Sequence, residues 1–373
     1  MLGEQYNGWC GEPPALSVRG VVVLGGGPAG AATALELARR GRDVVLLEAT
    51  RFDGPRFGET LPPEANPLLR RLGVWDAFLG SRPLPSPGTV SAWGSSRPAE
   101  TDFVANPHGG GWHVDRNRFD GVLCAAAADA GADLRAGVRA LRCARGPDRT
   151  WTIATSDPAG PVRARFVVDA TGRNGLRLEP RDGRTVDDAL IALFLRFAHD
   201  GAARSPDART LVESSADGWW YTAPLPSGES VAAFTVDPRL YVTHGVGLAE
   251  QLARAPLTCA RVGRARLVAS HAVHVSSSLR RAPAEAGWAA VGDAAAAYDP
   301  LSGFGIVKGL RDALALADAL DADACPDYAA EQRRRFEAYA RQRRAYYAHE
   351  RRWADRPFWR GRGLRPAGAS ADR

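Results

Sequence analysis

Residues 21–48 read VVVLGGGPAGAATALELARRGRDVVLLE, and this stretch decides the fold. An apolar β-branched run leads directly into glycines spaced G-x-G-x-x-G, at Gly25, Gly27 and Gly30. An alanine-rich segment follows, and a second apolar run ends in Glu48. Strand, glycine turn, helix, strand and terminal acid in this order predict a β-α-β unit that binds a dinucleotide. Glu48 is expected to accept hydrogen bonds from a ribose diol.

Each glycine of the motif has a separate physical task. Gly25 permits the tight turn, Gly27 lets the backbone approach a pyrophosphate, and Gly30 lets helix and strand pack closely. Pro28 and Ala29 lie in the same turn, where the helix begins. Free N–H groups and the helix dipole favour phosphate binding at this point.

The composition is that of an ordinary globular protein. The chain has 373 residues, 45% hydrophobic and 24% charged, which suits one large domain or two interwoven ones. Its five cysteines form no C-x-x-C, so we expect no disulfide framework and no metal site, and a cytoplasmic location. No apolar run is long enough to span a bilayer, and the first residues lack the pattern of a signal peptide. Membrane insertion is therefore not expected.

Basic residues are nearly all arginine, and Lys308 is the only lysine. Arginine clusters at 333–335 and 343–344 fall in a predicted basic helix from Tyr328 to Trp353. No recognition motif accompanies them, so we interpret them as a solvated helix face and expect no nucleic-acid partner. Three aromatic residues of this helix are expected to face inward: Phe336, Tyr339 and Tyr346.

The remaining elements follow from local patterns. Four further helices are expected: Pro67–Leu79, Arg118–Ala130, Gly247–Arg254 and about Val307 to Leu320. A buried strand at Phe166–Val168 leads into the turn Asp169-Ala170-Thr171-Gly172. Between residues 186 and 283, alternating patterns predict antiparallel strands.

Three motifs stand together along the chain: the early G-x-G-x-x-G with Glu48, the turn Asp169–Gly172, and Gly292-Asp293…Asp299-Pro300…Gly303-x-Gly305-Ile306. Their order and spacing resemble the FAD-dependent oxidoreductases of the p-hydroxybenzoate-hydroxylase-like superfamily. The resemblance covers most of the chain and implies that the cofactor is FAD.

In that family the late Gly-Asp contacts the ribityl and pyrophosphate part of FAD, and the loop after the proline faces the flavin ring. The sequence Asp115-Arg116-x-x-Phe119-Asp120 is similar to a family helix start whose arginine lies near FAD. The expected cofactor-binding residues are Gly25, Gly27, Pro28, Ala29, Gly30, Glu48, Thr60, Arg116, Gly172, Gly292, Asp293, Pro300, Gly303, Gly305 and Ile306.

Four shorter stretches resemble a narrower branch, the tryptophan-halogenase-like flavoproteins. That branch includes relatives that modify peptidyl tryptophan when protein-derived quinone cofactors are made. The stretches are Gly58–Pro63, Gly111–Arg116, Gly218–Tyr221 and Asp299–Gly303.

The chain departs from the halogenases in two places. They carry a lysine after the Gly-Glu turn, which handles hypohalous acid, but no lysine lies between Gly58 and Trp112 here. Arginine stays protonated and cannot readily replace an amine. The halogenase motif W-x-W-x-I-P is matched only in part, by Trp219–Pro224.

The resemblance leaves the electron donor open. Single-component aromatic hydroxylases have an Asp-Gly motif that helps to bind FAD and NADPH, whereas the corresponding stretch here is Asp169–Arg173. No second nucleotide-binding fingerprint occurs. We expect electrons from transiently docked NAD(P)H or from a separate flavin reductase.

The leading functional hypothesis is an FAD-dependent monooxygenase that hydroxylates an electron-rich aromatic, either an indole or a peptidyl tryptophan. The resemblance implies a flavin C4a-hydroperoxide as the oxygen donor. The expected catalytic residues are Glu59, His113 and Tyr221, and the expected substrate-lining residues are Trp219, Trp220 and Phe304. Strand alternation sends Trp219 and Tyr221 to one face and Trp220 to the other, so one indole is expected in the core.

The expected fold is α/β: an FAD-binding Rossmann-like domain of three layers, β/β/α, with an inserted antiparallel substrate-side sheet and C-terminal helices. The cofactor domain is expected at 19–80, 110–185 and 284–325, and the substrate-side sheet at 81–109 and 186–283. A flexible leader at 1–18, a C-terminal helix at 326–360 and a disordered tail at 361–373 complete the expected division.

Three other functions fit the same motifs. They are a flavin-dependent halogenase, a geranylgeranyl-reductase-like flavin reductase or dehydrogenase, and a non-catalytic flavin-loaded maturation partner. The mass of the product separates the enzyme classes, since hydroxylation adds one oxygen and reduction changes two hydrogens.

Overall fold

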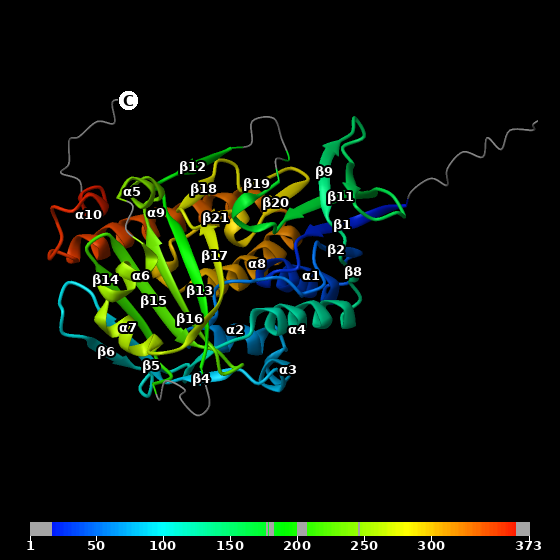
Figure 1. Ribbon diagram of the computed structural model, residues 1–373. Coiled ribbons are helices and arrows are strands. Elements are labelled where there is room, and N and C mark those ends of the chain that lie inside the picture. The colour runs from blue at the N-terminus through cyan, green and yellow to red at the C-terminus, as the bar shows by residue number, and fades with distance from the viewer. Residues whose placement is uncertain (1–16, 177, 179–182, 200–206, 245–246, 363–373) are drawn as a thin grey trace, which may run out of the picture.

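The computed structural model describes residues 17–176, 178, 183–199, 207–244 and 247–362. Nearly all of the expected leader and tail lie outside these residues. Two large sheets with helices between and around them form the described chain (Figure 1). No helix in the described part is long and apolar enough to cross a membrane.

The first sheet is the dinucleotide-type sheet. Five of its strands are parallel, in the order β20-β11-β1-β2-β8, and β19 adds antiparallel to β20. A hairpin of β9 and β10 joins β11. The strands are β1 (Val18–Leu24), β2 (Val44–Glu48), β8 (Asp133–Ala136), β9 (Ala140–Arg145), β10 (Trp151–Thr155), β11 (Val162–Asp169), β19 (Ala284–Glu285) and β20 (Trp288–Ala290).

Helices cover one face of this sheet and the hairpin covers the other. Three helices pack together on the first face: α1 (Pro28–Arg39), α4 (Arg116–Asp129) and α8 (Gly305–Asp321). On the opposite face, Trp151 and Ile153 of the hairpin pack against Val22 and Val45. The expected three-layer β/β/α domain is confirmed.

Close backbone contact joins α1 to the sheet. A Cβ on Gly30 would lie 1.9 Å from the carbonyl oxygen of Gly25, so no side chain fits there. Gly25 has a φ of +107°, which L-residues rarely adopt, and a Cβ there would lie 2.5 Å from the Ala170 oxygen. These two positions therefore require glycine for geometric reasons.

The second sheet, called the large sheet, has seven strands, in the order β17-β13-β16-β15-β14-β5-β6. All its pairs are antiparallel except β14 with β5. Its strands are β5 (Gly88–Ala92), β6 (Ala99–Asp102), β13 (Ile191–Ala198), β14 (Thr210–Ser215), β15 (Gly218–Pro224), β16 (Ser230–Val236) and β17 (Arg266–His274). Three short helices lie beside it: α5 (Pro238–His244), α6 (Leu248–Ala253) and α7 (Pro256–Val262).

Two small sheets have three strands each. One pairs β3 (Thr60–Leu61) and β4 (Leu84–Ser86) with β7 (Gly111–His113), and the other pairs β12 (Arg184–Val186) and β21 (Ala296–Ala297) with β18 (Ser278–Arg280). Strand β4 was expected in the substrate-side sheet. It pairs with β7 instead, while β5 and β6 join the large sheet.

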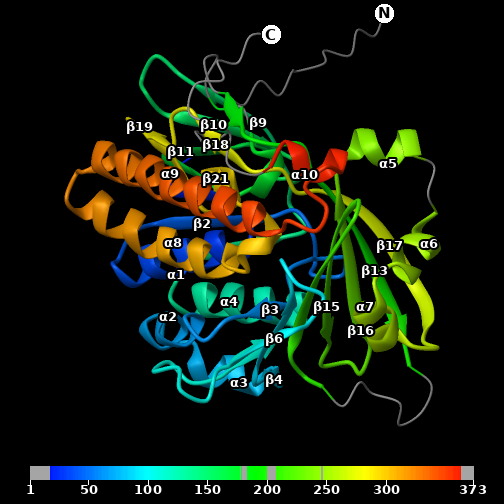
Figure 2. The same cartoon turned by 90° about the vertical axis from the view of Figure 1, so that its left-hand side faces the viewer.

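Several helices differ from the expected ones. The segment 67–79 forms two helices, α2 (Ala65–Arg71) and α3 (Trp75–Gly80), because Gly73 turns the chain with a φ of +59°. The C-terminal segment forms α9 (Cys325–His349) and α10 (Pro357–Arg360), and α9 lies along α8 (Figure 2).

The prediction that three aromatic residues of α9 face inward is confirmed for Phe336 and Tyr339 and is wrong for Tyr346. Tyr346 is 45% exposed, whereas its neighbour Tyr347 is 2% exposed. Steps of three and four residues from Phe336 lead through Tyr339 and Arg343 to Tyr347, all of them buried, so Tyr346 falls outside the packed face.

A buried ion pair ties the first sheet to the small sheet of β18. Asp169, at the end of β11, accepts from the Arg280 guanidinium at 2.6 Å, and the two side chains are 0% and 2% exposed. The other Asp169 oxygen accepts from the backbone and hydroxyl of Thr171. Asp169 therefore fixes the turn that follows β11 as well as the contact between sheets.

Replacing Arg280 by methionine is expected to destabilise the protein by ~3–5 kcal/mol, because the Asp169 charge would stay buried without its partner. Arg163→Met provides the matched control. Arg163 pairs with Asp148 at 2.7 Å, but these side chains are 33% and 52% exposed, so its loss should leave the stability almost unchanged. Urea denaturation midpoints measure both. Equal losses would show that burial does not decide the strength of this pair.

Candidate functional site

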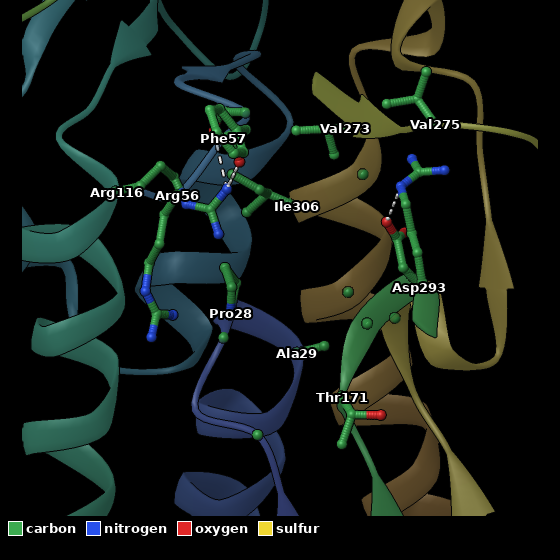
Figure 3. Close-up of a pocket in the computed structure, with 18 of the residues that line it drawn as sticks. Pro28, Ala29, Arg56, Phe57, Arg116, Thr171, Val273, Val275, Asp293 and Ile306 are labelled. Carbon is green, nitrogen blue, oxygen red and sulfur yellow. Dashed lines mark hydrogen bonds and ion pairs between the residues drawn. The ribbon is translucent and has the colours of Figure 1, made fainter. Parts of the chain in front are cut away.

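A cavity of about 680 Å³ lies between the carboxyl ends of the parallel strands and the large sheet. Doubly wound α/β proteins bind their ligands at this edge of the sheet. In Figure 3 Pro28, Arg116 and Phe57 lie on one side of the cavity, and Thr171 and Asp293 lie on the other. The volume is typical of a small-molecule site.

Most of the expected residues line this cavity. The lining members of the cofactor set are Gly25, Gly27, Pro28, Ala29, Glu48, Thr60, Arg116, Gly172, Gly292, Asp293, Pro300, Gly303, Gly305 and Ile306. Gly30 is not among the lining residues, and its contact with the Gly25 oxygen gives it a packing role. Glu59, Trp219 and Tyr221 also line the cavity.

Three expected residues lie away from the cavity. Trp220 is fully buried on the other face of β15, where its ring stacks on Phe234 at 4.8 Å. Phe304 is 37% exposed and does not line the cavity. His113 is fully buried and does not line the cavity, but its ring bonds to Thr60, which does. The expected alternation along β15 explains the position of Trp220.

The sequence motifs did not indicate several lining residues. Phe57 packs against Phe194 with ring centroids 4.4 Å apart, and Val273 and Val275 lie next to them along the large sheet. Strand alternation in 191–198 could have indicated Phe194, since its neighbours two residues away share its face. Phe57 has no such signal, because it lies in a loop outside any motif.

Glycines at four lining positions leave room for a bound group. A Cβ on Gly27, Gly172, Gly303 or Gly305 would meet no protein atom within 4 Å. Gly27 and Gly305 begin α1 and α8 without a positive φ, so neither packing nor backbone strain demands glycine there. Open backbone at two helix N-termini suits the phosphates and ring of a dinucleotide cofactor. The lining residues therefore fit FAD.

Glu48 is held in place by its surroundings. One carboxylate oxygen accepts from the Gly26 backbone at 2.8 Å, and the other accepts from Thr50 and from Arg56 at 2.7 Å. Arg56 also pairs with Asp120, a fully buried carboxylate. The oxygen facing Gly26 accepts one hydrogen bond from the described residues and keeps a lone pair for a ribose hydroxyl.

The sole lysine binds the loop that follows β20 and does not face the cavity. The Lys308 ammonium donates to the Gly292 carbonyl and to Asp312, each at 2.8 Å, and is 6% exposed. Asp312 also accepts from the Gly292 N–H. The amine is therefore fixed in the loop that carries Asp293, and Lys308 does not line the cavity.

Arg116 is bound to the protein on both sides. It makes two bonds at 3.1 Å to Asp120 and donates to the carbonyls of Phe57 and Gly58. These bonds fix the loop that carries Glu59. Burial raises the pKa of the Glu59 carboxyl, and the nearby Arg116 charge opposes this rise.

A directional chain of hydrogen bonds runs through Thr60. The Nε2 of His113 lies 2.7 Å from the carbonyl of Ala208, so it carries the proton and leaves Nδ1 as an acceptor. Nδ1 then accepts from the Thr60 hydroxyl at 3.1 Å, and Thr60 accepts from the Tyr221 hydroxyl at 2.6 Å. Burial lowers the pKa of His113 to about 4 and raises the pKa of Tyr221. His113 is therefore neutral at physiological pH.

One hydroxyl of the C-terminal helix joins the two walls of the cavity. Tyr347 accepts from the Trp219 indole N–H at 3.0 Å and donates to Asp299 at 2.7 Å. Trp219 and Asp299 both line the cavity, on β15 and on the loop before α8. Tyr339 of the same helix accepts from the Asp299 backbone N–H at 2.6 Å. Helix α9 is thus a second layer of the site.

Comparison with protein families and curated proteins agrees with this geometry. The family model described as 'FAD binding domain' matches residues 19–181 of the chain. The chain is similar to a putative FAD-dependent oxidoreductase, LodB of Marinomonas mediterranea, with 27% identity over 91% of this chain and 96% of that protein. It is also similar to the flavin-dependent halogenase armH3 of Armillaria mellea, with 32% identity over 56% of this chain and 44% of that protein.

Solved structures share the fold. The flavin-dependent halogenase CmlS matches with a TM-score of 0.82 and 23% identity, over 95% of this chain and 69% of that one. The peptidyl tryptophan dihydroxylase QhpG, which is essential for tryptophylquinone cofactor biogenesis, matches with a TM-score of 0.75 and 25% identity, over 95% and 82%. Together the cavity, the glycines that line it and these similarities identify the chain as an FAD-dependent oxidoreductase, similar to the tryptophan-halogenase-like flavoproteins of the p-hydroxybenzoate-hydroxylase-like superfamily.

Proposed function

We propose that the protein is an FAD-dependent monooxygenase that hydroxylates an electron-rich aromatic ring, with a tryptophan within a peptide as its substrate. One observation carries the proposal. The end of the cavity next to the large sheet is lined by aromatic and apolar side chains together with Glu59 and Tyr221. The amine of the sole lysine is held away from it by Gly292 and Asp312.

One of the similarities, that to QhpG, supports this choice of reaction. LodB matches over nearly its full length, whereas the match to armH3 covers less than half of that halogenase. QhpG, named as a peptidyl tryptophan dihydroxylase, has a chain of comparable extent. Hydroxylation forms no hypohalous acid, so it does not need the lysine that the halogenases carry.

Bound and reduced FAD would supply one oxygen atom from O₂, while the second leaves as water. The electrons come from NAD(P)H directly or through a separate flavin reductase. The protein's own part is orientation and exclusion of water. Phe57, Phe194 and Val273 form an apolar wall for the ring. Glu59 accepts the proton that the ring loses, and the Tyr221 hydroxyl, aligned by Thr60, contacts the substrate.

Halogenation is the second candidate, because armH3 is 32% identical to the chain over the matched residues. Halogenation requires another group to handle hypohalous acid in place of the missing lysine. The arginines are always charged, so they cannot act as a reversible proton carrier.

The decisive measurement is the mass of the product. Purified enzyme with FAD, reduced anaerobically and then mixed with O₂, should add one oxygen to a tryptophan-containing peptide. The same reaction with chloride or bromide should give no halogenated product. Halogenated product would replace the proposed function by the second candidate. Loss of two hydrogens or gain of two without oxygen would replace it by a reductase or dehydrogenase, and absence of turnover would favour a maturation partner.

Glu59→Gln should lower turnover by about 10²-fold or more while FAD stays bound, as expected for loss of a general base. Because burial raises the pKa of Glu59, wild-type activity should fall as pH drops through a value above the ordinary ~4.3 of glutamate. The variant should lack this acidic limb.

Glu64→Gln is the matched control. Glu64 lies five residues away, does not line the cavity and makes no side-chain cap on α2. It should keep both turnover and pH profile. If the acidic limb of the pH profile is unchanged in Glu59→Gln, Glu59 is not the group that accepts the proton of the ring.

A further inference from the structure

The outer edge of β17 leads directly to the cavity. Val273 and Val275 line the cavity, and Figure 3 shows both directed toward it. Val273 lies opposite Ala192 of β13, and His271 lies opposite Phe194. The His271 ring is 5.6 Å from Phe57, which also lines the cavity. Alternate residues of β17 therefore continue the cavity wall out to the surface.

This strand is the last one of the large sheet, on the side away from α8 and α9 (Figure 2). The Val275 N–H donates to the Leu190 carbonyl on the β13 side. The N–H and C=O groups of successive residues point to opposite edges of a strand. Those of Ser270, Ala272 and His274 therefore point away from β13, toward the outer edge of the sheet. In the described part of the chain, no hydrogen bond reaches these outward backbone groups.

Proteins usually protect such an edge. Prolines, bulges or very short strands are the common devices. Strand β17 is nine residues long and has no proline, and its one register irregularity lies toward its start, opposite Arg196 and Phe197. From Ser270 to His274 every residue except Val273 is exposed. The other edge strand, β6, has four residues, none of which lines the cavity.

We propose that the outer edge of β17 binds the peptide substrate as an added β-strand and so delivers its aromatic residue to the cavity. This inference rests on the proposed peptidyl substrate. Backbone hydrogen bonds to Ser270, Ala272 and His274 supply affinity, and alternate side chains of the added strand fall on the cavity face. A ring opposite His271 or Val273 lies at the mouth formed with Phe57.

Charge indicates the composition of the peptide. Arg264 and Arg266 are exposed at the far end of β17, and neither has an ion-pair partner among the described residues. With a net charge of +6, the chain attracts acidic partners over some distance. The expected substrate is an extended segment with acidic residues on one side of its aromatic residue.

The test measures binding without turnover. A short fluorescent peptide with one central tryptophan and glutamates on one side of it is titrated with the oxidised, FAD-loaded enzyme, and anisotropy gives Kd. Two further peptides of the same sequence carry N-methyl groups on alternate amides. One is methylated at the odd-numbered amides and the other at the even-numbered amides. The wild-type enzyme should bind the first peptide and lose at least one N-methylated form.

Ala272→Pro removes an outward N–H and leaves the ladder to β13 intact, because proline is tolerated where the edge N–H faces solvent. It should weaken peptide binding about tenfold, the loss expected for one backbone hydrogen bond. Ala272→Ser keeps the N–H and should bind like wild type, as should Glu100→Pro on the opposite edge. Melting temperature and FAD content verify that each variant is folded.

The outcomes separate this inference from the proposed function. Unchanged binding by both N-methylated peptides, or by folded Ala272→Pro, would overturn the docking edge even if the peptide is hydroxylated. Tight strand-dependent binding without hydroxylation would keep the edge and reject the reaction. A wild-type dimer that Ala272→Pro dissociates, with no peptide binding, would assign the edge to a second copy of the chain instead.

Discussion

The whole arrangement depends on how closely α1 approaches the turns after β1 and β11. A Cβ on Gly30 would come within 1.9 Å of the Gly25 oxygen, and one on Gly25 within 2.5 Å of the Ala170 oxygen. With both positions free of side chains, the N-terminus of α1 sits directly over the carboxyl ends of the parallel strands. The turns after β1, β11 and β20 then meet at one edge, and the cavity lies there.

Local chemistry explains why much of this was predictable. The glycine motif, the turn after β11 and the segment 292–306 each carry their geometry in adjacent residues, and nearly all of their expected members line the cavity. Alternation along β15 likewise separated Trp219 and Tyr221 from Trp220. These predictions needed no knowledge of distant contacts.

The features that the sequence did not predict depend on long-range contacts or on which side of a helix a residue faces. Nothing near His113 in the sequence shows that Ala208 fixes its tautomer, and it was expected at the cavity rather than behind Thr60. Tyr346 and Tyr347 are adjacent aromatics on a helix, and a phase difference of one residue decides which is buried. Phe57 is positioned by Arg116, fifty-nine positions away, through a bond that no pattern encodes.

The Trp219–Tyr347–Asp299 contact also limits how the protein can be redesigned. Its three members come from the large sheet, the C-terminal helix and the loop before α8, and the middle residue supplies both bonds with one hydroxyl. A chimera that exchanges the substrate-side sheet with a relative would have to import the matching part of α9 as well. The unit that must be exchanged together in this protein is therefore larger than the sheet that lines the cavity, and it includes a helix that does not line the cavity at all.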